Sequence, residues 1–221
     1  MPSERFLKLR KDKQDRILDA ARKEFARVPF EEASINQIIR DAEISRGSFY
    51  TYFEDKIDLL QYVFKDTNDR NTELMKEQVI RRNGDFYLAL EDWLRIVVRY
   101  MDTELLQQSV GIFMQNAMNL QIRDFMKKKP SREEEKKLCE WILCNCGKAC
   151  FGTGLDREHQ EILVEMMQTL AALSALKIIM APEYSEEVIR AFHIEMEFMK
   201  RGAGGMDTAS VFEEKGQVSI S

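Results

Sequence analysis

The chain has 221 residues, of which 44% are hydrophobic and 32% charged, and its formal net charge is −5 at pH 7. Only 4 prolines and 10 glycines interrupt a sequence rich in helix-forming residues, which favours an all-α fold and excludes a large sheet. Because we find neither a run of about 18 apolar residues nor the apolar segment of a secretory signal, we expect a cytoplasmic protein without membrane contact.

Charge is distributed unevenly along the sequence. Residues 1–23 carry eight basic and four acidic side chains, a local charge of +4, and the acidic excess lies further along the chain. Phosphate binding is driven by lysine and arginine, so the acidic average argues against nucleic acid as a partner of the whole chain. Binding of DNA through the N-terminal end alone remains compatible with this pattern.

Apolar spacing and capping residues predict two helices in the first 45 residues. Apolar side chains at spacings of three and four predict a helix over about residues 12–27, ended by Pro29. Ser34 has the pattern of an N-cap for a short second helix that stops near Ala42. Gln37, three residues after this serine, would complete a capping box.

A third short helix and a long fourth helix are predicted next. Ser45 can cap the third helix, whose first turn, Arg46–Ser48, is almost free of bulk. Asp55 is the predicted cap of the fourth helix, which runs toward residue 82, and Asn83 with Gly84 marks a turn.

The second half of the chain is also predicted to be helical. A capping box formed by Ser131 and Glu134 marks one of the boundaries. The predicted helices cover about residues 86–106, 109–127, 131–151, 157–180 and 185–200. The predicted organisation is therefore a small domain over residues 1–60, a larger helical domain over 61–201 and a disordered tail over 202–221.

Three N-terminal helices with a tight turn before the third match the helix-turn-helix plan, in which the third helix lies in the major groove of DNA. A slim first turn lets such a helix approach base edges. Phe49 and Phe53, four residues apart, are assigned to the core. Tyr50 and Tyr52 are expected to point elsewhere, with hydroxyls suited to phosphate oxygens, and Lys56 adds a positive charge.

The segment from about residue 16 to residue 60 contains ILDAARKEFA, SINQIIRDAEIS and RGSFYTYFEDKIDLL. It resembles the DNA-binding domain of the tetracycline-repressor (TetR) family. The sequence departs from the family at Glu43, where the turn between the second and third helices usually has glycine. The resemblance implies DNA contacts from Ser34, Asn36, Gln37, Arg46, Gly47, Ser48, Tyr50, Tyr52 and Lys56.

The same resemblance implies that the larger domain binds a small effector and forms a homodimer through its last two long helices. Two apolar bands, over residues 162–179 and 188–199, are consistent with dimerisation. The expected function is a homodimeric repressor that an effector releases from a palindromic operator in double-stranded DNA. Bulky side chains suited to an apolar or aromatic effector are the candidate pocket residues Trp93, Tyr100, Phe113, Met114, Met118 and Trp141.

The sequence shows no motif for catalysis, a resident cofactor or a metal site, so we do not expect an enzyme. Two alternative functions stay open. A redox- or metal-sensing regulator could use the cysteine cluster between residues 139 and 150, in which Cys139, Cys146 and Cys150 would share one helical face. A helical interaction module that does not bind DNA is the other alternative.

Overall fold

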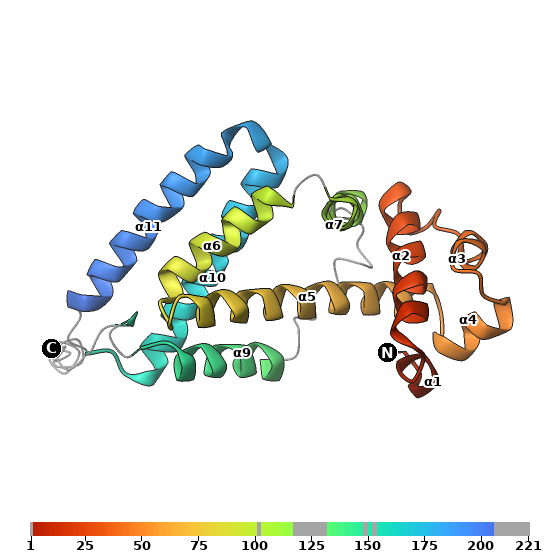
Figure 1. Ribbon diagram of the computed structural model, residues 1–221, viewed down its shortest axis with the longest axis horizontal. Helices are drawn as coiled ribbons and strands as arrows, with labels where there is room; N and C mark the ends of the chain where they lie inside the picture. Colours follow the sequence, from red (N-terminus) through yellow and green to blue (C-terminus); the bar gives the residue numbers. More distant parts are fainter. Residues whose placement is uncertain (1, 101–102, 117–131, 148–149, 152–153, 206–221) are drawn as a thin grey trace, which may run out of the picture. The chain divides into compact units, whose positions relative to one another are not determined.

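The computed structural model describes residues 2–100, 103–116, 132–147, 150–151 and 154–205. All regular elements within these ranges are helices, which confirms the all-α fold class (Figure 1). The α-helices are α1 (Glu4–Leu7), α2 (Lys11–Arg27), α3 (Ile35–Asp41), α4 (Arg46–Tyr52), α5 (Lys56–Arg81), α6 (Phe86–Arg99), α7 (Glu104–Asn116), α9 (Arg132–Asn145), α10 (Arg157–Met180) and α11 (Ser185–Gly205).

The helices divide into two units. The N-terminal unit consists of the described residues within 1–71 and 101–129, and the C-terminal unit of those within 72–100 and 130–221. Helix α5 contributes residues to both units.

Side-chain caps set the boundaries of the short helices, as predicted. The Ser34 hydroxyl accepts a hydrogen bond from the backbone N–H of Gln37 at 3.3 Å and begins α3. The Ser45 hydroxyl accepts from the N–H of Ser48 at 3.0 Å and begins α4. These bonds satisfy N–H groups that the first turn of a helix leaves without a partner.

The predicted capping box at Ser34 is only half formed. The backbone N–H of Ser34 donates to Glu24 Oε1 at 2.8 Å, whereas the side chain of Gln37 donates to Asp41. The carboxylate of Glu24 is buried and also accepts from Arg27, so it ties the end of α2 to the start of α3. Glu24 of α2 thus accepts the hydrogen bond from the Ser34 N–H that Gln37 was predicted to accept.

Helix α1 was not predicted, and it completes the core of the N-terminal unit. Phe6 is fully buried, and its ring centroid lies 4.7 Å from that of Phe53 and 5.3 Å from that of Tyr62. The Ser3 hydroxyl donates to the carbonyl of Thr51 at 2.7 Å. This bond fastens α1 to the end of α4.

Helix α7 also belongs to the N-terminal unit, which differs from the domain boundary predicted at residue 60. Its Gly111 packs so closely on α2 that an added Cβ would lie 3.0 Å from the Cβ of Ala26. Ile112 is buried in the same core as the residues of α2 to α5, and Lys23 forms an ion pair with Glu104. No local pattern in the sequence predicts a contact between helices as far apart in the chain as α2 and α7.

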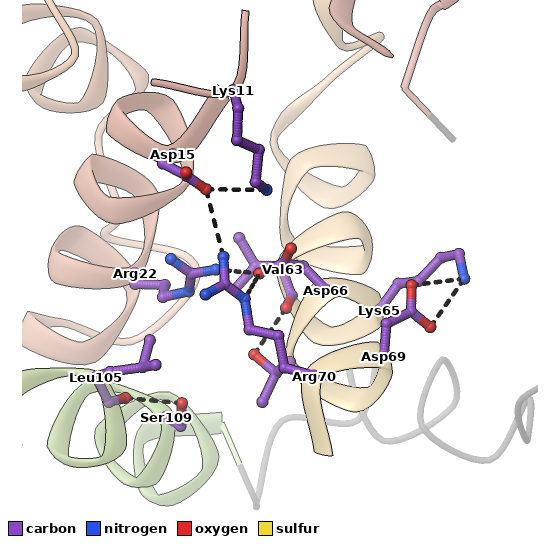
Figure 2. Close-up of polar contacts among 11 residues, drawn as sticks. Lys11, Asp15, Arg22, Val63, Lys65, Asp66, Asp69, Arg70, Leu105 and Ser109 are labelled. Atoms are coloured by element: carbon purple, nitrogen blue, oxygen red, sulfur yellow. Dashed lines mark hydrogen bonds and ion pairs between the residues drawn. The ribbon is translucent and has the colours of Figure 1, made fainter. Parts of the chain in front are cut away.

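A buried ion pair connects α2 to α5 inside the N-terminal unit (Figure 2). Arg22 Nη2 donates to Asp66 Oδ2, and the two side chains are only 4% and 13% exposed. Arg70 also donates to Asp66, at 2.9 Å, and reaches Asp15 of α2 at 3.3 Å. Burial lowers the pKa of Arg22, but the neighbouring carboxylate favours its charged form.

The C-terminal unit contains the end of α5 together with α6, α9, α10 and α11, and its buried apolar side chains come from all of them. Helix α10 has the predicted bounds, whereas α6 ends at Arg99, earlier than predicted, and α11 extends to Gly205. The predicted helix over 109–127 overlaps α7 at residues 109–116, and α7 begins earlier than predicted, at Glu104. Residues 117–131, the cap at Ser131 and the predicted tail beyond 205 lie outside the described residues.

Helix α10 is, within the described parts of the chain, the one segment long and apolar enough to cross a membrane by length and composition. The prediction found no such run. Buried core helices of soluble proteins meet the same criterion, and one face of α10 is buried against its neighbours, including Val164, Met167 and Ala171. This single helix is weak evidence for a membrane span.

Candidate nucleic-acid interface

The first turn of α4 projects from the N-terminal unit. Arg46 and Gly47 are exposed, and an added Cβ on Gly47 would meet only the Ser45 hydroxyl, at 3.9 Å. The opposite face of α4 is anchored by Phe49, which is fully buried. A slim and exposed first turn on a firmly packed helix is the geometry that the sequence predicted for entry into a groove.

Three of the predicted contact residues, from two helices, lie against one another. Arg46 Nη1 donates to Asn36 Oδ1 of α3 at 2.8 Å. Arg46 Nη2 donates to the Tyr50 hydroxyl at 3.4 Å, and the guanidinium carbon lies 5.6 Å from the centroid of the Tyr50 ring. All three side chains are exposed, with Tyr50 at 48%. The structure thus brings α3 and α4 together at one polar surface.

The remaining predicted residues of α3 and α4 are engaged within the unit. Ser48 shares a hydrogen bond with the Ser45 hydroxyl at 2.8 Å. Gln37 pairs with Asp41 and Arg40 on the surface of α3. Ser34 is half-buried and uses its hydroxyl as the cap. Their polar groups lie near the exposed turn but are tied to protein partners.

We expected Tyr52 to point away from the core, but the structure places it in the core. Its side chain is 8% exposed, and its ring contacts Phe6 edge-on, with centroids 6.0 Å apart. Tyr52 follows Phe49 by three residues and therefore shares its helical face, which the prediction assigned to Phe53 instead. Helix α4 ends at Tyr52, and Phe53 is buried from an extended backbone.

Lys56 makes contacts that the sequence did not indicate. Its Nζ donates to the carbonyls of Glu31 and Ala33, at 3.2 and 2.9 Å, and lies 4.5 Å from the centroid of the Phe30 ring. Burial lowers the pKa of this amine, and the nearby carboxylates of Glu31 and Glu24 oppose the shift. Lys56 therefore holds the loop between α2 and α3, and a phosphate would have to compete with these carbonyls.

The turn between α3 and α4 accommodates Glu43 in a left-handed conformation, with φ of 55°. Most side chains avoid this region, and glycine adopts it without cost. The carboxylate of Glu43 accepts a hydrogen bond from Arg16 Nη1 of α2 at 3.0 Å. The negative charge that the departure from the family pattern introduces is thus paired with a cation of the same unit.

Much of the N-terminal positive charge is also paired. Arg22 is buried against Asp66. Four more cations form exposed ion pairs with acids of the same unit, namely Lys8, Arg10, Lys11 and Lys23. Exposed pairs are weak, so these side chains can exchange their carboxylate partners for phosphates.

Residues 17–63 match the family model described as "Bacterial regulatory proteins, tetR family". The match begins in α2, ends in α5 and includes all of α3 and α4. These residues form a TetR-family domain.

Solved structures include a similar chain, the crystal structure of a TetR family transcriptional regulator from Chloroflexus aurantiacus J-10-FL. The similarity covers 91% of this chain and 98% of that chain, with 20% identity and a TM-score of 0.39. No curated protein matches the chain.

Outside the TetR-family domain, the three predicted pocket residues whose side chains the structure describes do not gather around a cavity. Trp93 and Trp141 are half-buried, and Lys76 lies 5.6 Å from the centroid of the Trp141 ring. Tyr100 is exposed at the end of α6. The side chains of Phe113 and Met114, and all of Met118, lie outside the described residues.

Two small cavities in the C-terminal unit are lined by other residues. The larger, of about 280 Å³, lies between α10 and α11, with Ser174, Lys177 and Phe192 in its wall. The smaller, of about 70 Å³, lies between α6 and α11 and includes Tyr87 and His193. Of the predicted pocket residues whose side chains the structure describes, Trp93, Tyr100 and Trp141, none lines either cavity.

The cysteines are arranged differently from the prediction. Helix α9 ends at Asn145, so Cys146 and Cys150 do not extend a helical face that begins at Cys139. Burial raises the pKa of the Cys146 thiol to about 12 and also raises the pKa values of Cys139 and Cys150. Reactive cysteines have lowered pKa values. Among the described residues, no three acids, cysteines or histidines are grouped as metal ligands.

Proposed function

We propose that this protein is a ligand-responsive transcriptional regulator that binds a palindromic DNA operator as a homodimer and acts as a repressor. The TetR-family domain supports the DNA-binding part of this function. A protein that binds chromosomal DNA in a bacterium works in the cytoplasm, so we propose that location as well.

The observation that carries the proposal is the exposed first turn of α4. Arg46 and Gly47 project from a helix whose other face is fixed by Phe49, and Asn36 of α3 lies beside them. Residues at the start of a recognition helix contact base edges in the major groove. Phe49 and Tyr52 bury the opposite face of α4, so this turn and the adjacent Tyr50 are the part of α4 available to DNA.

Selection of duplexes from a random pool tests DNA binding directly. We expect the full chain to enrich a palindromic sequence and to bind it more tightly than a scrambled duplex. Between 50 and 200 mM salt, affinity should fall at least about tenfold, because lysine and arginine displace counterions from phosphates. Equal binding to selected and scrambled duplexes would contradict the proposed function and favour a protein-interaction module.

The apolar surface of the last two helices supports dimerisation. Helix α10 buries one face in its own unit, yet it exposes a second row of apolar side chains at spacings of four and seven residues. Helix α11 exposes two more. The exposed side chains are Ile162, Met166, Leu173, Met180, Ile194 and Phe198. Large exposed apolar rows on paired helices mark interaction sites, and a second copy of the chain would cover them.

Charged residues introduced into the exposed apolar rows of α10 and α11 should dissociate the dimer. We expect the wild-type chain to sediment as a dimer and the double variant Met166→Glu, Phe198→Glu to sediment as a monomer with unchanged helical circular dichroism. Ile80 is exposed to 65% on α5, so Ile80→Glu is a matched control that should remain dimeric. A monomeric wild-type chain at micromolar concentration would contradict the dimer.

An effector remains part of the proposal on the strength of the family resemblance. The larger cavity, about 280 Å³, is at the lower end of the volumes that hold small molecules, which favours a small effector. Its wall combines Lys177 and two glutamates with apolar groups, so it does not match the apolar or aromatic ligand we expected. The raised pKa values of Cys139, Cys146 and Cys150 argue against redox sensing by these three thiols.

A further inference from the structure

The guanidinium group of Arg46 is fixed by two neighbouring side chains. Asn36 Oδ1 accepts from Nη1 at 2.8 Å, and the Tyr50 hydroxyl accepts from Nη2 at 3.4 Å. One partner lies on α3 and the other one turn further along α4. Because both partners are on packed helices, a long side chain that would otherwise sample many rotamers is held in one orientation.

Donor capacity remains for a ligand after these two bonds. A guanidinium group carries five N–H donors, and within the described part of the chain Arg46 uses two of them. As the first residue of α4, Arg46 stands where a recognition helix meets base edges. Asn36, which could read a base itself, uses its carbonyl oxygen to orient Arg46, so the free N–H groups of the guanidinium are the donors presented to a base.

Base pairs differ in what they offer such a group of donors. In the major groove, guanine presents two adjacent acceptors, O6 and N7. Adenine presents one acceptor beside an amino donor, cytosine an amino donor, and thymine one acceptor beside a methyl group. A fork of N–H donors is therefore complementary to guanine, and the other three bases leave donors unpaired or opposed.

We propose that Arg46 recognises a guanine in each half-site of the operator and that Asn36 is the residue that positions it. This inference rests on the proposed DNA-binding function and adds the base that α4 selects. Tyr50 supports the same orientation through its ring and hydroxyl. Its exposed face also lies beside the guanidinium, which keeps the cation over an aromatic surface.

A contact between Arg46 and a phosphate is the competing role, and it has a different signature. Loss of a phosphate contact weakens binding to all sequences alike and lowers the salt slope by about one. Loss of a contact to a guanine edge changes the ranking of sequences and removes discrimination at one position. The two roles are therefore separated by base preference.

The experiment uses the full-length chain, duplexes selected from a random pool, and the variants Arg46→Ala, Asn36→Ala and Lys65→Ala. Each base of the selected half-site is replaced in turn, and one guanine is replaced by 7-deazaguanine, which lacks only the N7 acceptor. Lys65 is a control of equal charge change, since it pairs with Asp69 on α5. Arg46 and Asn36 are exposed, so the variants should keep the helical circular dichroism and melting temperature of the wild type.

For the wild type and Lys65→Ala, we expect replacement of one half-site guanine to weaken binding about 10-fold to 100-fold, and 7-deazaguanine there to weaken it as well. Arg46→Ala should be indifferent to both changes while keeping the preferences at other positions. Asn36→Ala should show a reduced penalty at the same guanine. A penalty that survives in Arg46→Ala, or a uniform loss of affinity for all duplexes, overturns the inference although DNA binding stands. If no duplex is enriched, the proposed function itself fails.

Discussion

Replacing Asp66 by alanine should destabilise the N-terminal unit by about 3–5 kcal/mol, because it leaves the buried guanidinium of Arg22 without its counter-charge. Arg22 is 4% exposed, and its Nε already lacks a hydrogen-bond partner among the described residues. Arg70 would lose the same carboxylate and keep only Asp15 (Figure 2). Hydrogen exchange of the α2 amides measures this loss in the unit where it occurs.

Asp69→Ala is the matched control for this variant. Asp69 lies on the same helix, but it is 59% exposed and pairs with Lys65 on the surface, so its loss should cost less than about 1 kcal/mol. The double variant Arg22→Met, Asp66→Leu replaces both charges by apolar groups and should recover most of the stability lost by Asp66→Ala. Equal amide protection in Asp66→Ala and Asp69→Ala would show that the buried pair does not hold α2.

The ion pair also has a consequence for how the TetR-family domain moves. Asp66 and Arg70 belong to the part of α5 inside the N-terminal unit, and Arg22 and Asp15 belong to α2. Because breaking a buried pair is costly, these two helices are expected to move as one body if α5 is displaced. A displacement of α5 would then reach α3 and α4 through the α2–α3 contacts of Glu24.

Helices α2 to α5 could be predicted well because their signals are local. Ser34 and Ser45 each cap a helix by accepting from the backbone N–H three residues further along the chain. The predicted starts of α3 and α4 are confirmed. Asp55 likewise accepts from the N–H of Asp58 at the start of α5. Where the partner came from another helix, the prediction was wrong, as with Glu24 in place of Gln37 at the N-terminus of α3.

In the candidate site too, local features could be predicted and contacts between distant residues could not. Motif and spacing indicated Arg46 and Tyr50, and the resemblance to the TetR family implied Asn36. The structure brings the three side chains together. The spacing of three residues from Phe49 allows Tyr52 to share the buried face, but its ring packs on Phe6, a residue of an unpredicted helix 46 positions earlier. The pairing of Arg16 with Glu43 across 27 residues is equally non-local. Such contacts arise from packing, which one sequence does not reveal.

Replacing Gly84 by alanine should destabilise the C-terminal unit by about 2–5 kcal/mol, since it combines backbone strain with a steric clash. Gly84 has φ of 83°, and its N–H donates to the carbonyl of Val79 at 2.9 Å to close the end of α5. An added Cβ would lie 2.6 Å from the carbonyl oxygen of Asn145 and 3.1 Å from the Cα of Cys146. Both are backbone atoms, which cannot swing aside as the end of a side chain can.

Tryptophan fluorescence during urea unfolding measures this effect, because both tryptophans of the chain, Trp93 and Trp141, belong to the C-terminal unit. Gly202→Ala is the control: Gly202 is in α11 and an added Cβ meets no atom within 4 Å, so the variant should gain about 0.5–1 kcal/mol from helix propensity. Asn83→Gly, beside Gly84 and also at positive φ, should change stability little. If Gly84→Ala unfolds at the wild-type urea midpoint, the close contact between the α5–α6 turn and the end of α9 is not what stabilises this unit.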